Sequence, residues 1–186
     1  MDSHVEKVFN LEDFISHIIC DQLKRLIYTS DISPYSKFLT LPQYIEFLGA
    51  CIDEHEFIDE TKSKSRFNNV LTKYFKPINN KYILYNDTHL KWNLYKDFRC
   101  GVVHQLRPLN KIAFTTRDEA KESGNKHLEI DEKHDEYLVL VLEDMYDHIE
   151  KVANNIINDH KNKKFKENVN IKWTIGHISV INNGEN

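Results

Sequence analysis

The sequence lacks any pair of cysteines at the C-x-x-C spacing that is typical of zinc and redox sites. Its three cysteines, Cys20, Cys51 and Cys100, are odd in number and widely separated, so they indicate neither kind of site. We therefore expect a reduced, cytoplasmic protein.

Long hydrophobic runs are also missing. The longest uninterrupted apolar run, residues 137–142, is far too short to span a bilayer. Near the N-terminus, Glu12 and Asp13 interrupt the apolar residues. We expect neither a signal peptide nor a membrane segment.

An excess of positive charge is absent as well. Twenty-nine acidic side chains against twenty-five basic ones give a formal charge of -4, so the chain as a whole does not attract nucleic acid and any RNA contact must be local. The 186 residues, 40% of them hydrophobic, suffice for one core. No internal repeat, low-complexity tract or domain boundary divides them, so residues 1–186 are expected to form a single helical domain, alone or as a homo-oligomer.

Most of the chain has the hydrophobic periodicity of amphipathic helices. The predicted helices cover about residues 11–27, 40–52, 65–74, 88–107 and 132–159. A turn that contains Ser33 and Pro34 separates the first two. Thr40 is predicted to cap the second helix, with Gln43 in the reciprocal position, and Asp131 is predicted to cap the last one. The last helix should be a central member of the bundle.

The remaining segments alternate between apolar and polar residues, which indicates β-structure. Residues 112–114 and 128–130 predict a β-hairpin within an insertion over residues 111–130. The C-terminal extension, residues 161–186, should contain a short strand over residues 169–175, bent near Gly176, and a disordered end from Asn182 to Asn186. The expected fold class is therefore mainly α: about five helices in a HEPN-like bundle, with a small antiparallel β-hairpin and a short C-terminal strand.

A basic connector follows the last predicted helix and contains Lys161, Lys163, Lys164 and Lys166. A charge run of this kind fits a solvated linker. Contact with a phosphate backbone is the alternative.

The segment Arg99-Cys100-Gly101-Val102-Val103-His104 resembles the R-x4-H signature of HEPN-type proteins. The specific similarity covers the dozen residues from Leu94 to Gln105, and the helical order from about Leu11 to Asp159 agrees with that family. The resemblance implies metal-independent RNA cleavage, in which the ribose 2'-hydroxyl attacks the adjacent phosphate and leaves a cyclic phosphate end.

Arg99 and His104 would be the catalytic residues. Histidine suits proton transfer near neutral pH, so His104 would act as general base or acid. The Arg99 guanidinium matches phosphate oxygens bidentately and would stabilise the transition state. Lys96, Cys100, Gln105 and Arg107 are the expected substrate-binding positions, and neither a cofactor nor a metal is expected.

Helix geometry places this pair apart within one copy. On an ideal α-helix Arg99 and His104 lie roughly 140° apart around the axis and about 7.5 Å apart along it, so they cannot pair as i and i+4 neighbours do. A dimer with two such helices side by side could bring the arginine of one copy near the histidine of the other, as the resemblance also implies. Homodimerisation is therefore part of the hypothesis.

A second hypothesis keeps the fold but makes it a non-catalytic interaction or scaffold module that binds a protein partner or a nucleotide. Arg99 would then pair with an acidic neighbour such as Asp97 or Asp135, and Gly101 would permit close helix packing. Cys100 favours this alternative, because active family members often carry a polar residue such as Asn there. The chain contains ten histidines, but none has H-E-x-x-H or other ligand spacing, so a metal site is not expected.

Overall fold

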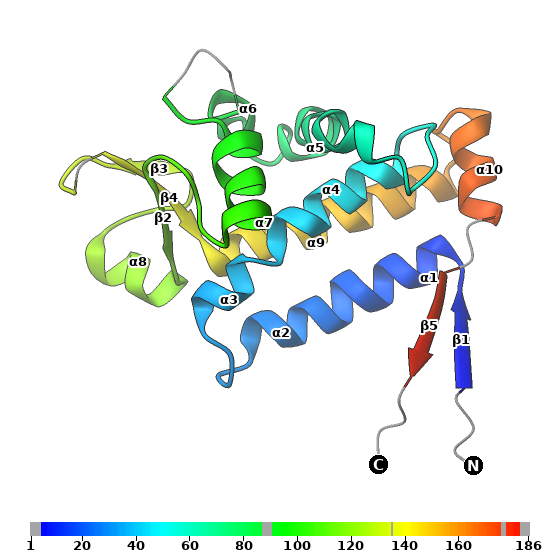
Figure 1. Ribbon diagram of the computed structural model, residues 1–186, viewed down its shortest axis with the longest axis horizontal. Helices are drawn as coiled ribbons and strands as arrows, with labels where there is room; N and C mark the ends of the chain where they lie inside the picture. Colours follow the sequence, from blue (N-terminus) through cyan, green and yellow to red (C-terminus); the bar gives the residue numbers. More distant parts are fainter. Residues whose placement is uncertain (1–4, 87–90, 135, 176–177, 183–186) are drawn as a thin grey trace.

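The computed structural model describes residues 5–86, 91–134, 136–175 and 178–182 (Figure 1). The fold is mainly helical with a small β element, which confirms the expectation of a mainly α fold. No helix in the described ranges is both long and apolar enough to cross a membrane.

The first predicted helix is confirmed. It consists of α1 (Leu11–Ile15), the π-helical stretch η1 (Ser16–Leu23) and α2 (Lys24–Tyr28) in direct succession. The Asn10 side chain caps its start by accepting a hydrogen bond from the Asp13 backbone N–H over 2.8 Å.

The next helix, α3 (Pro34–Phe38), occupies the segment that was predicted as a turn. Ser33 caps it, since its hydroxyl accepts a hydrogen bond from the Ser36 backbone N–H over 3.2 Å. A proline in the first helical turn is compatible with this start. The predicted turn is therefore a short capped helix.

The second predicted helix exists as α4 (Leu41–Cys51), but its predicted capping box is wrong. Thr40 has helical backbone angles, and its hydroxyl donates to the Lys37 carbonyl over 2.8 Å instead of accepting a hydrogen bond from α4. The Gln43 amide donates backwards to the Leu39 carbonyl over 3.5 Å. The threonine thus closes α3, and α4 begins without a side-chain cap.

The third predicted helix is also present, preceded by the 3₁₀ turn η2 (Glu60–Lys62). It comprises α5 (Ser63–Val70) and the π-helical η3 (Leu71–Phe75). Helix α5 packs closely on α4 at Gly49, where a Cβ atom would lie 2.2 Å from the Arg66 carbonyl oxygen. The short helix α6 (Lys81–Leu84) follows.

The predicted helix over residues 132–159 begins later than expected. Its first part is the strand β4 (Tyr137–Val141), and the helix α9 runs over Leu142–Lys161. Asp131 belongs to β3 (Glu129–Asp131), and its carboxylate accepts hydrogen bonds from the Lys133 and His134 backbone, so the prediction that it caps the helix is wrong. The central position of α9 is confirmed: its apolar stripe is buried in the main core, and Figure 1 shows it crossing behind α4.

The predicted hairpin between residues 112–114 and 128–130 is wrong. Strands β2 (Ile112–Thr115) and β3 do not pair with each other, because β4 lies between them in the order β2-β4-β3. β2 pairs with β4 in parallel, and β3 pairs with it antiparallel; Leu138 faces Ile112 on one side and Ile130 on the other. Helix α8 (Arg117–Ser123) occupies the connection after β2.

The predicted strand over residues 169–175 is a helix, α10 (Glu167–Ile175). Trp173 explains why this segment is a helix. Its ring is buried and its indole N–H donates to the Cys51 carbonyl over 2.7 Å, which anchors the segment on α4. A short C-terminal strand does exist further on, as β5 (Ile178–Asn182), antiparallel to β1 (Val5–Phe9). Asn182 is therefore ordered, whereas residues 183–186 and the predicted bend at Gly176 lie outside the described residues.

Candidate functional site

The segment with the R-x4-H signature folds as one helix made of two parts. The first part, η4 (Leu94–Cys100), has π-helical hydrogen bonding, and α7 (Gly101–Gln105) continues it. Asn93 caps the start: its side chain accepts from the Lys96 N–H over 2.8 Å, and its own N–H donates to the buried Asp97 carboxylate over 2.7 Å. The helix is thereby fixed at the end that precedes Arg99.

Three apolar side chains hold this helix on the core. Leu94, Phe98 and Val102 are each about 1% exposed. Gly101 allows the chain to return closely over the helix, because a Cβ atom there would lie 2.7 Å from the Arg107 carbonyl oxygen and from the Leu109 nitrogen. Gly101 thus permits a close approach, as expected, but the segment that approaches is the returning loop and not another helix.

The Arg99 side chain is directed to helix α4, where its Nε donates to the Glu46 carboxylate over 2.5 Å. Its Nη1 and Nη2 atoms make no hydrogen bond or ion pair with a described residue. Burial lowers the pKa of Arg99, but the hydrogen bond and charge of Glu46 outweigh this effect, so the net pKa is raised. Glu46 thus orients a permanently charged guanidinium and leaves its outer edge available.

The acidic partner of Arg99 differs from both residues that the sequence suggested. Asp97 accepts from the Asn93 backbone instead, and residue 135 lies outside the described part of the chain. Glu46 is 53 residues away in the sequence, so no local spacing could identify it.

His104 lies near the C-terminal end of α7 and is exposed. Within the described ranges its ring makes no hydrogen bond, ion pair or aromatic contact. Gln105 and Arg107 are exposed beside it, and the helix ends at Leu106, which has a left-handed backbone conformation with φ 56°. The imidazole is therefore available to solvent and to a ligand.

Arg99 borders a groove of about 630 Å³ between the first helix, α4 and η4–α7. Its other lining residues are mostly apolar: Phe14, Ile18, Gln43, Tyr44, Glu46, Phe47, Ala50, Phe57, Arg66 and Val103. Lys96 and Cys100 line a different cavity, of about 440 Å³, together with Asn93 and Asn110. One copy of the chain thus does not gather all the predicted site residues in one cavity.

Sequence analysis missed a second arrangement of polar side chains, in which Tyr82 lies between two histidines. The Tyr82 hydroxyl is 2.9 Å from His127 Nε2 and 2.9 Å from His148 Nδ1. His127 Nδ1 accepts a hydrogen bond from the Val141 backbone N–H over 3.0 Å, so the neutral His127 ring carries its proton on Nε2. His127 must then donate to Tyr82, and the Tyr82 hydroxyl is left with its own proton to donate to His148 Nδ1.

The buried end of this arrangement stays neutral. His127 is 8% exposed, and burial, supported by the charges of His148 and Lys81, lowers its pKa to about 3. Burial also lowers the pKa of His148. These three residues come from separate segments of the chain, so only the tertiary structure could bring them to attention.

No group of three or more His, Cys, Asp and Glu side chains in the described ranges has an arrangement that could hold a metal ion. Comparisons of the chain with protein-family models, with curated proteins and with solved structures give no match.

Proposed function

We propose that this chain is a HEPN-like, metal-independent endoribonuclease that acts through Arg99 and His104. One observation carries the proposal: Glu46 occupies only the Nε atom of Arg99, so the four N–H groups on Nη1 and Nη2 remain to bind phosphate oxygens, while the His104 ring five residues later is exposed and makes no hydrogen bond with any described residue. A guanidinium with one edge anchored and the other free is suited to bidentate phosphate binding.

In the proposed reaction His104 removes the proton of a ribose 2'-hydroxyl. The 2'-oxygen forms a bond to the adjacent phosphorus, the bond from phosphorus to the 5'-oxygen breaks, and the 5'-oxygen leaves with a proton taken from water. His104 returns the proton that it accepted to the solvent. The products are a 2',3'-cyclic phosphate and a 5'-hydroxyl end. Arg99 stabilises the extra negative charge on the phosphate oxygens in the transition state. The step needs no metal, oxidant or cofactor.

A homodimer is part of the proposal, because Arg99 faces the groove toward α4 whereas His104 is exposed beyond it in a single copy. Two copies with their η4–α7 helices adjacent would combine the arginine of one with the histidine of the other. We place this activity in the cytoplasm, since Cys20, Cys51 and Cys100 are all free thiols.

The test is incubation of purified protein with total RNA in EDTA, followed by analysis of the RNA ends. Wild type should produce cyclic phosphate ends, and His104→Ala and Arg99→Ala should each abolish them. His134→Ala is the matched control, because His134 is an exposed histidine on the loop after β3. Cleavage that survives in either motif variant, or that requires a divalent metal, contradicts the proposal.

Mixing the two inactive variants tests the shared site. If each site takes Arg99 from one copy and His104 from the other, half of the sites in a mixed dimer are intact. Mixing equal amounts of Arg99→Ala and His104→Ala should then restore roughly a quarter of wild-type activity, given free exchange of subunits. No recovery, with mixed dimers demonstrated, would mean that each copy carries its own site.

The second candidate function is a non-catalytic module that binds a protein partner. The apolar wall of the Arg99 groove favours it, because Phe14, Tyr44, Phe47 and Phe57 line a cavity large enough for apolar side chains of a partner. Wild-type protein that leaves RNA intact under all tested conditions would favour this candidate.

A further inference from the structure

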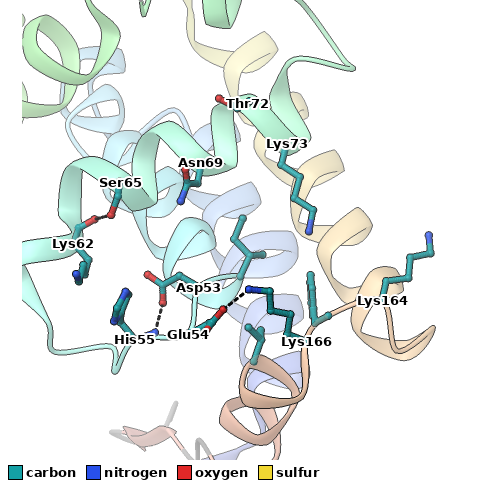
Figure 2. A pocket seen from close by; sticks show the side chains of 13 residues that line it. Asp53, Glu54, His55, Lys62, Ser65, Asn69, Thr72, Lys73, Lys164 and Lys166 are labelled. Atoms are coloured by element: carbon teal, nitrogen blue, oxygen red, sulfur yellow. Dashed lines mark hydrogen bonds and ion pairs between the residues drawn. The ribbon is translucent and has the colours of Figure 1, made fainter.

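A separate groove of about 800 Å³ borders α5 (Figure 2). It shares no lining residue with the Arg99 groove. Its walls are the loop after α4, one face of α5 and η3, and the connector between α9 and α10. The polar residues along the α5 and η3 wall are Lys62, Ser65, Asn69, Thr72 and Lys73.

The charge in this groove is positive although the whole chain is negative. Lys62, Lys73, Lys164 and Lys166 line it, against two carboxylates. The Asp53 carboxylate is already bound by two buried cations, Arg66 over 2.6 Å and Lys172 over 3.1 Å. Asp53 therefore contributes little net negative charge to the groove.

The two lysines of the connector have carboxylate partners. Lys166 pairs with Glu54 over 2.7 Å, as the dashed line in Figure 2 shows, and Lys164 pairs with Asp159 over 2.9 Å. These exposed pairs are weak and can exchange for another anion at small cost. The connector is thus more than a solvated linker, because it forms one wall of the groove.

The two lysines of the helical wall have no such partner. Lys62 and Lys73 make no ion pair with any described carboxylate, and the Lys73 ammonium lies 5.0 Å from the centre of the Phe165 ring. Figure 2 shows them at opposite ends of the wall. Eleven residue steps of helix place their backbones on the order of 15 Å apart, a spacing that suits two different phosphate groups.

We propose that this groove binds a run of successive phosphates, as presented by the backbone of single-stranded RNA. The choice of RNA rests on the proposed function, whereas the phosphate chemistry follows from the groove itself. Lys62 and Lys73 bind phosphates at the two ends of the run. Asn69 lies between them and supplies its amide N–H groups to the intervening backbone, whereas the Ser65 and Thr72 hydroxyls already donate to the Lys62 and Asn68 carbonyls over 2.8 and 2.9 Å. The chain as a whole is negatively charged, but this groove is positive and would attract RNA locally.

The test measures binding separately from cleavage. A fluorescent RNA of about 12 nucleotides with 2'-O-methyl groups spans a site of this kind and has no 2'-hydroxyl to react. Fluorescence anisotropy of the full chain in EDTA gives its affinity at several salt concentrations. The variant is Lys62→Gln combined with Lys73→Gln. The control, Lys24→Gln combined with Lys151→Gln, removes the same charge from two exposed lysines outside the groove.

Wild type should bind the RNA, and the groove variant should bind it roughly tenfold more weakly, with a salt slope smaller by about 1.4 because two phosphate contacts are lost. The control should change affinity by about twofold or less. The inference is overturned if wild type does not bind, if the groove variant binds like wild type, or if both variants weaken binding equally. Arg99→Ala and His104→Ala should still bind this RNA. Binding without cleavage would therefore contradict the nuclease proposal and leave the groove proposal standing.

Discussion

Glu46 of α4 holds Arg99 of η4 through a single hydrogen bond, from Nε to the carboxylate, over 2.5 Å. The side chains of the pair are 21% and 15% exposed, so the contact is shielded from water on most sides. A half-buried carboxylate that touches only one edge of a guanidinium acts as a support for it.

Replacing Glu46 should therefore reduce RNA cleavage. In Glu46→Ala the guanidinium loses the group that orients it, and we expect kcat to fall by about tenfold or more with a smaller change in KM. Glu46→Gln keeps a hydrogen-bond acceptor and should recover part of the loss. Gln43→Ala, in the same helix and the same groove, is the control. Faster cleavage by Glu46→Ala would mean that the carboxylate competes with phosphate.

Replacing the buried Arg66 should strongly lower the free energy of unfolding. It is 4% exposed, pairs with Asp53, and donates to the backbone carbonyls of His55, Glu56, Phe57 and Asp59. Arg66→Met removes five hydrogen bonds of a buried ion-pair network, although Asp53, His55, Glu56 and Asp59 each keep another donor. The free energy of unfolding should fall by about 3–5 kcal/mol in urea denaturation. Arg25→Met, at an exposed arginine of α2, should change it by about 0.5 kcal/mol or less.

Gly49→Ala should destabilise the contact between α4 and α5. The added methyl group would lie 2.2 Å from the Arg66 carbonyl oxygen, so the helices must separate, at a cost of about 1–3 kcal/mol. Gly124→Ala is a useful comparison, because it meets no atom within 4 Å but sits at φ 78°. It should cost about 1 kcal/mol through backbone strain alone. Equal melting temperatures for wild type and Gly49→Ala would contradict the close approach.

Tyr82→Phe should destabilise the protein, because it removes the hydrogen bonds that join Tyr82 to His127 and His148. It removes the acceptor of His127 and the donor to His148, so the unfolding free energy should fall by about 1–3 kcal/mol. Imidazole nitrogen NMR should find the proton on Nε2 of both rings in wild type. Tyr35→Phe, which removes a donor to the exposed Leu106 carbonyl, should cost less. A proton on Nδ1 of His127 would contradict the assignment.

The free energy of unfolding should decrease as the pH falls below 6.5, the ordinary pKa of histidine. The His127 pKa is lowered from 6.5 to about 3, so between 6.5 and about 3 the unfolded chain binds more protons at this residue than the folded chain does. In the middle of this window His127 alone should reduce the unfolding free energy by about 1.4 kcal/mol per pH unit, and by less near either end. Urea denaturation at several pH values gives the slope, and His127→Gln should make it shallower. An unchanged slope in that variant would exclude His127 as its source.

The parts of the fold that could be predicted are those in which one local pattern dominates. Leu11, Ile15, Ile19 and Leu23 repeat at helical spacing, and all are buried in one continuous helix. The strand β4 was missed because its run of apolar residues continues directly into the stripe of α9. A fully buried strand and a buried helix segment are hard to distinguish from sequence.

Non-local contacts explain the other differences. The alternation near Trp173 favours a strand, but the contact of the indole with Cys51 in α4 is made by a helix. The pairing of β2 with β4 depends on register with a segment more than twenty residues away. Within the candidate site, the Arg99 and His104 positions could be proposed from their spacing. Glu46, Tyr82 and His127 could not, because their partners are distant in sequence.

The π-helical turn of η4 fixes the phase of the residues that follow it. Hydrogen bonds in such a turn reach one residue further than in an α-helix, so it accommodates one extra residue without breaking the helix. Leu94 and Phe98 anchor the segment on the core, and the wide turn determines how Val102 and His104 are then presented. Deleting one residue from the wide turn would let it close as an ordinary α-helix, so α7 would keep its phase and the imidazole its side of the bundle. Deleting one residue between this turn and His104 would instead rotate the imidazole by about 100° relative to the anchor.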